Sequence, residues 1–176
     1  MKLIDESISF NESHDDEHAL RFITSQIQIF INHLKETYPD SDLTKNLLAK
    51  YSGCQILPFR KGANPNTYTS GMFDHNTGTV KIAVRDGAGN LRDEASLNKS
   101  IVHEIAHATR FKYLGETSHS TEWKDAWKTF LKIATEELGW KVEAPCSSKS
   151  FYGLNEDDCP KCEWEISGPC ESKPYR

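Results

Sequence analysis

The sequence lacks any run of apolar residues long enough to cross a bilayer, which excludes a membrane-spanning helix. Its first residues, MKLIDESISFNESHDDEH, lack the apolar centre of a signal peptide, so we expect an intracellular location, in the cytoplasm or the nucleus. The chain also lacks the basic excess of an autonomous nucleic-acid binder, because its net charge is −5. At 37% hydrophobic and 27% charged residues, it has the composition of a soluble globular protein.

Methionine and cysteine are also scarce. The five cysteines are an odd number, and four of them lie in the last third of the chain. In a reducing compartment such clustering favours metal binding over disulfides. A length of 176 residues suffices for one domain with a small appendage. We expect a domain over residues 1–142 and a Cys-rich tail over residues 143–176.

The hydrophobic pattern predicts both helices and strands. Helices are expected over residues 15–38, 41–50, 94–114 and 120–138, and strands over residues 54–59, 68–74 and 79–84. The last two strands flank His75-Asn76-Thr77-Gly78, a good hairpin signal. The predicted fold is therefore α+β: a compact, zincin-like domain with helices packed on a short antiparallel sheet, and the helix over residues 94–114 in its centre.

That central helix contains an H-E-x-x-H motif, His103-Glu104-Ile105-Ala106-His107. Residues four apart share one face of a helix, so the two imidazoles can bind a single ion. Glu104 can then reach a water held by that ion. Most of the surrounding helix is apolar, and polar side chains inside such a helix need a compensating interaction. A divalent metal, most often zinc, would supply it.

A third protein ligand is needed if water is to occupy the fourth position. His119 is the first choice, because a turn at Gly115 could fold its loop back toward the helix. Glu122 is the second choice and Glu116 also competes, since some zinc hydrolases use a carboxylate as third ligand. The site is not that of a metzincin. Arg110 stands where the extended motif has glycine, and no methionine follows the third ligand.

These residues resemble a known family. HEIAHATR followed by HSTEWKDAW is similar to the SprT-like (Spartan-like) and WLM group of zinc metalloproteases, over roughly residues 51–140. The hairpin SGMFDHNTGTVKIAV also resembles the strands that precede the family's active-site helix. The resemblance implies that His103, His107 and His119 bind zinc and that Glu104 is the catalytic base. The chain departs from the family at Ser120, where many members have glycine.

The resemblance implies an intracellular zinc metalloendopeptidase whose partner is a protein or peptide substrate, with DNA-associated or crosslinked proteins as one substrate class. Zinc would lower the pKa of its bound water to about 7, and Glu104 would accept the proton. An extended peptide could pair with the strand near Thr79–Val84. The oxyanion-stabilising residue is open among Tyr68, Tyr113 and Tyr152. Two alternatives are a zinc hydrolase of a non-peptide amide and a non-catalytic, zinc-stabilised protein-binding module.

The cysteine-rich tail is a second candidate metal site. Cys159-Pro160-Lys161-Cys162 has the spacing of a zinc knuckle, and Cys146 and Cys170 could complete four thiolate ligands for a structural zinc ion. The alternatives are reduced thiols, or disulfides in an oxidising compartment. We expect Cys54 to be a buried strand residue.

Overall fold

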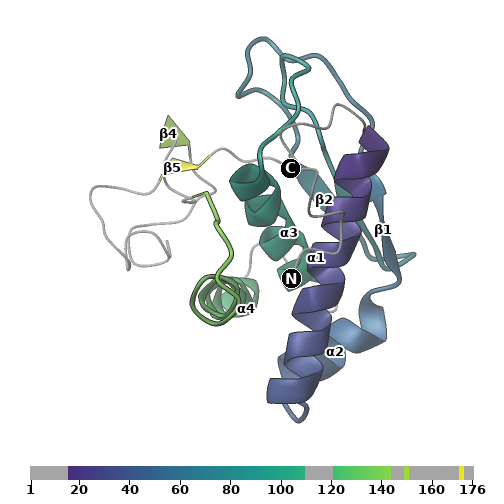
Figure 1. Ribbon diagram of the computed structural model, residues 1–176, viewed down its shortest axis with the longest axis vertical. Helices are drawn as coiled ribbons and strands as arrows, with labels where there is room; N and C mark the ends of the chain where they lie inside the picture. Colours follow the sequence, from purple (N-terminus) through teal and green to yellow (C-terminus); the bar gives the residue numbers. More distant parts are fainter. Residues whose placement is uncertain (1–15, 110–120, 144–148, 151–170, 173–176) are drawn as a thin grey trace.

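The computed structural model describes residues 16–109, 121–143, 149–150 and 171–172. Within these ranges the chain forms four α-helices, one π-helical turn, a three-stranded sheet and a separate pair of two-residue strands. The α+β class is thereby confirmed (Figure 1). The zincin-like likeness and the boundary at residue 142 stay predictions, because most of the tail lies outside the described residues. No helix in the described ranges combines the length and apolar character needed to cross a membrane.

The first two helices follow the sequence pattern closely. Helix α1 spans Asp16–Thr37 and begins with Asp16 and Glu17, whose charges suit the positive end of a helix. Helix α2 spans Asp42–Lys50, and the Ser41 side chain accepts a hydrogen bond from the Leu43 backbone N–H at 3.2 Å. The apolar stripe of α1 is buried: Ala19, Phe22, Ile23, Ile27, Phe30, Ile31 and Leu34.

The sheet consists of β1 (Gly53–Ile56), β2 (Gly71–Asp74) and β3 (Thr79–Ile82), in the order β1-β3-β2. The β2–β3 hairpin is antiparallel as predicted, but β1 runs parallel to β3. The prediction of an antiparallel sheet is thus wrong for one pair of strands. Both the end of β1 and the start of β2 lie beside Ile82, so residues 57–70 cross over the end of β3 to reach the far edge.

The two faces of the sheet have different surroundings. Phe73, Val80 and Ile82 are buried on the face that the helices cover. Gln55 and Met72 are exposed on the opposite face. This alternation is typical of a sheet with one packed side and one solvated side.

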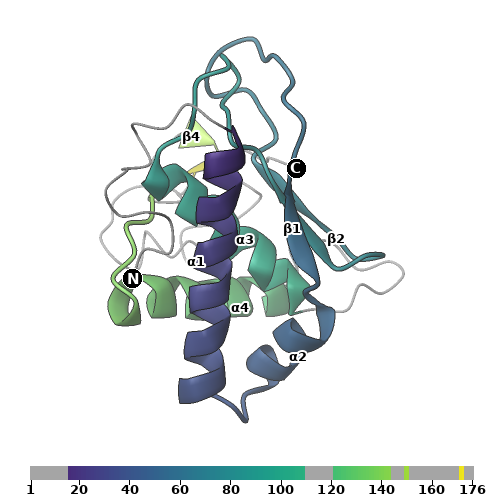
Figure 2. The same ribbon diagram turned by 45° about the vertical axis from the view of Figure 1, so that its right-hand side comes forward.

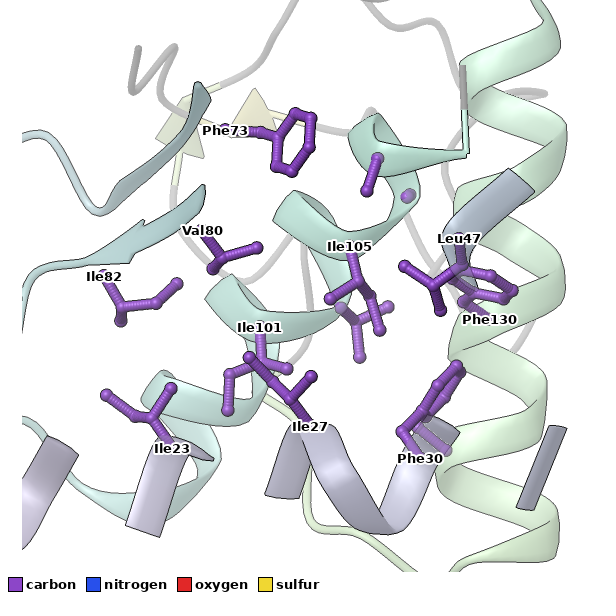
Figure 3. Close-up of a cluster of buried hydrophobic side chains, with 14 of the residues drawn as sticks. Ile23, Ile27, Phe30, Leu47, Phe73, Val80, Ile82, Ile101, Ile105 and Phe130 are labelled. Atoms are coloured by element: carbon purple, nitrogen blue, oxygen red, sulfur yellow. The ribbon is translucent and has the colours of Figure 1, made fainter. Parts of the chain in front are cut away.

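Helix α3, Glu94–Ala108, lies at the centre of the fold, as predicted, and packs against β2, β3, α1, α2 and α4. Asp93 caps it by accepting a hydrogen bond from the Ser96 backbone N–H at 2.8 Å. Ile101 and Ile105 of α3 lie in the apolar core, which also contains labelled side chains from β3, α1, α2 and α4 (Figure 3). The predicted extension to residue 114 lies outside the described residues beyond Thr109.

Helix α4, Thr121–Lys132, crosses α1 at a steep angle (Figure 2). Its apolar stripe packs on the core, where the rings of Phe130 and Phe30 meet edge to face at 4.9 Å between centroids. The predicted helix does continue to residue 137, but as a π-helical turn over Ile133–Glu137. Gly139 ends it with a φ of 69°, a conformation that glycine adopts without strain.

Candidate metal centre

Three potential metal ligands lie together on the buried centre of α3. His103, Glu104 and His107 are 3%, 0% and 8% exposed, and each offers a ligand atom within 4.8 Å of those of the other two. No other group of three His, Cys, Asp or Glu side chains in the described ranges meets the same criterion. The structure therefore brings together the two histidines of the motif, as their four-residue spacing predicts.

The distances within this cluster suit a shared cation. His103 Nε2 lies 4.0 Å from Glu104 Oε2, and the two imidazole centroids are 5.0 Å apart. At such short separations in a buried site, the carboxylate interacts strongly with any positive charge on or between the imidazoles. The arrangement can hold either an imidazolium–carboxylate pair or a bound metal ion.

Two tryptophans of α4 form an aromatic wall beside the histidines. The Trp123 ring stacks on His107 with centroids 5.0 Å apart and planes at 23°, and it lies 4.7 Å from the His103 ring. Trp127 stacks on Trp123 in turn, at 4.9 Å. Because both indoles are buried, they restrict the rotamers that the imidazoles can adopt.

Strand β2 approaches the cluster closely at Gly71. A Cβ atom at this position would lie 3.0 Å from Glu104 Cγ, Glu104 Oε2 and the Lys81 carbonyl oxygen. The absence of a side chain at Gly71 is therefore what allows the strand to pack directly on the Glu104 carboxylate.

The other residues predicted for the site are not brought into it by the described structure. Glu122 is exposed at the start of α4 and does not belong to the cluster. The Arg92 guanidinium lies over the aromatic ring of Tyr68, with 5.3 Å between Arg92 Cζ and the ring centroid. The remaining candidates fall outside the described residues: Tyr113, Glu116, His119, Cys146, Tyr152, Cys159, Cys162 and Cys170.

Two further expectations need correction. Strand β3 lies between β1 and β2, so the segment near Thr79–Val84 has no free edge over Thr79–Ile82 for an extended peptide to pair with. Cys54 is only half-buried, and its Sγ lies 3.1 Å from Thr24 Oγ1. Both follow from the position of β1 beside β3 in the strand order, which covers β3 and leaves β1 itself at the edge.

Arg92, a buried residue that joins several elements around the site, was not singled out from the sequence. Arg92 is 5% exposed and donates to the carbonyl oxygens of Ser70, Ala83 and Ser96 at 3.3, 2.7 and 2.8 Å. It also donates to the hydroxyls of Ser96 and Ser100 at 2.9 and 2.6 Å. Its guanidinium thus fastens the segment before β2 and the end of β3 to the first turns of α3. The only sequence signal was weak: Arg92 directly precedes Asp93, the residue that caps helix α3.

Comparison with known proteins identifies the class as capsid proteins of viruses. The family model described as Phycodnaviridae minor capsid protein P4 matches residues 2–173. The minor capsid protein P4 of Paramecium bursaria Chlorella virus 1 is 66% identical over 159 residues, which cover 90% of this chain and 88% of that protein. No solved structure was found to match. The chain belongs to the Phycodnaviridae minor capsid protein P4 family.

This finding overturns the resemblance to SprT-like and WLM metalloproteases. The predicted function as a zinc metalloendopeptidase is wrong. The same finding removes the support for a hydrolase of a non-peptide amide. Glu104 therefore has no assigned catalytic role. The resemblance depended on the metal-site helix, the following histidine segment and the preceding hairpin, within roughly residues 51–140, whereas the new match covers residues 2–173. Short motifs of this kind fix a local geometry that structural sites can also use.

Proposed function

We propose that this chain is a structural component of a viral capsid and that it acts by binding other capsid proteins. The observation that carries the proposal is the 66% identity to a minor capsid protein over 90% of the chain. Identity at that level extends beyond the buried core to much of the surface, and the surface is where contacts with partners are made.

The nearest of the predicted alternatives is the non-catalytic protein-binding module. Protein partners stand in place of a peptide substrate. DNA as a partner has only weak support, because the net charge of the chain is −5. Under this proposal the protein is located in the virus particle and, during assembly, in the host cytoplasm. The predicted nuclear location has no support.

Quantitative mass spectrometry of gradient-purified virus particles tests the proposal. The chain should co-sediment with the particles at a constant ratio to the main coat protein across the gradient. A non-structural protein of the same virus is the control and should fall away as the particles are purified. If the chain is abundant in infected cells and falls away like that control, it is not a capsid component.

A further inference from the structure

We propose that His103, Glu104 and His107 form a binding site for one divalent transition-metal ion, zinc, on the buried face of helix α3. The ion stabilises the fold, because it binds the three side chains only where the folded helix brings them together. The inference goes beyond the capsid function and does not depend on it, because it concerns the isolated chain.

The first argument is the donor set and its spacing. Imidazole nitrogen and carboxylate oxygen are ordinary zinc ligands, at about 2.0–2.2 Å from the metal. Two atoms bound to the same ion at that distance are at most roughly 4.4 Å apart. The Nε2–Oε2 distance of 4.0 Å between His103 and Glu104 already lies within this limit. All the ligand atoms of the cluster lie within 4.8 Å of one another, slightly more than this limit. Small rotations of the side chains would bring them within reach of one ion.

The second argument is the burial of the donor set. The three side chains are 3%, 0% and 8% exposed, on a stretch of α3 whose other buried residues are largely apolar. A divalent ion bound there would attract the carboxylate strongly, because little water is present to screen the two charges. Zinc binds the imidazoles in their neutral form.

The third argument concerns the surroundings, which hold the ligands in place. Trp123 stacks on His107 and lies beside His103, and the Gly71 backbone packs against Glu104. These contacts limit the positions that the three side chains can adopt, and such preorganisation favours binding of one ion.

Metal analysis of the purified full-length chain tests the proposal. The double substitution Cys159→Ser, Cys162→Ser removes the C-x-x-C pair of the tail, so that any remaining zinc reports on the helix site. After dialysis against zinc and then zinc-free buffer, this background should retain one zinc per chain. His107→Gln in the same background should retain almost none, and His18→Gln, a matched change on α1, should retain one. A background that retains no zinc, or a His107→Gln variant that retains as much as the background, would overturn the site.

A second set of measurements tests the structural role and does not require the His107→Gln variant to fold. A chelator should lower the melting temperature of the background chain, and added zinc should restore it. Glu104→Gln keeps the side-chain size and should weaken zinc binding by at least about tenfold, the lower end of what changes beside a metal ligand cause. If chelation leaves the melting temperature unchanged although zinc is removed, the ion does not stabilise the fold. If Glu104→Gln binds zinc with undiminished affinity, the carboxylate is not a ligand.

Discussion

At the scale of single residues, the Arg92 side chain shows how one buried cation can organise several elements. Its planar group donates to acceptors at fixed angles, which a lysine ammonium cannot reproduce. We therefore expect Arg92→Lys to lower the free energy of unfolding by about 1–3 kcal/mol, because buried carbonyl groups lose their donors. Urea denaturation measures the change.

The matched control is Arg85→Lys. Arg85 pairs with Asp16 at 2.9 Å, but both side chains are partly exposed, at 30% and 45%. An exposed ion pair contributes little, so this change should cost less than about 1 kcal/mol. Equal losses in the two variants would show that the buried contacts of Arg92 have no special weight.

Gly71 provides a second test at the residue scale. Gly71→Ala adds a methyl group 3.0 Å from Glu104 and from the Lys81 carbonyl oxygen, and such overpacking costs about 1–3 kcal/mol. Thermal unfolding should show a lower melting temperature. Met72→Ala, next in the strand and on the exposed face, should have a much smaller effect. A Gly71→Ala variant as stable as the wild type would mean that β2 can move away from Glu104 freely.

Part of the candidate site could be predicted from residue spacing alone. The two histidines four apart in an apolar helix had to share a buried face, and they do. The stacking of Trp123 on His107 and the approach of Gly71 to Glu104 could not be predicted in this way. They depend on how α4 and β2 dock against α3, and a local pattern contains no information on docking.

At the scale of elements, the junction between the end of α1 and the π-helical turn depends on one carboxylate. The Tyr38 hydroxyl donates to Glu137 Oε2 at 2.6 Å, and His33 Nε2 lies 2.6 Å from Glu137 Oε1. The hydrogen bond from Tyr38, followed by that with His33, holds the pKa of Glu137 below its ordinary value of 4.5. The same contact with Glu137 raises the pKa of Tyr38.

This shift makes a component of the stability depend on pH. Because the pKa of Glu137 is lower in the folded chain, the stabilisation is present above pH 4.5 and is lost as the pH falls through the folded-state pKa. Glu137→Gln should therefore reduce stability at neutral pH and flatten its fall in acid. Urea denaturation at a series of pH values measures this, with Glu136→Gln, an exposed neighbour, as the control. Parallel pH profiles for the wild type and the Glu137→Gln variant would contradict the assignment.

Most helices and strands could be predicted, but strand direction could not. The apolar period of 3.6 residues marks the helices locally, and Ser41 is a residue type that favours the start of a helix. The hairpin turn is also a local signal, and it fixes the antiparallel pairing of β2 with β3. A strand as short as Gly53–Ile56 contains no signal for the direction in which it pairs. The π-helical turn over Ile133–Glu137 also left no mark in the periodicity.

At the scale of the whole molecule, the assignment of a function required information that no single motif contains. The H-E-x-x-H pentapeptide describes how one helix turn can present two imidazoles, and that geometry serves catalysis and structure equally. A match along residues 2–173 includes the surface as well as the core, and so it distinguishes a capsid protein from an enzyme with a similar helix. The motif correctly indicated a buried polar cluster but not its use.

Cross-linking mass spectrometry of intact virus particles tests the central claim most directly. The chain has exposed lysines on different elements. They include Lys45 in helix α2, Lys61 in the segment between β1 and β2, and Lys132 at the end of helix α4. If the chain is a structural capsid component, these lysines should form reproducible cross-links to other capsid proteins, and dissociating the particles before the reaction should abolish them. If only cross-links within the chain are found in intact particles, the claim that it binds other capsid proteins is contradicted.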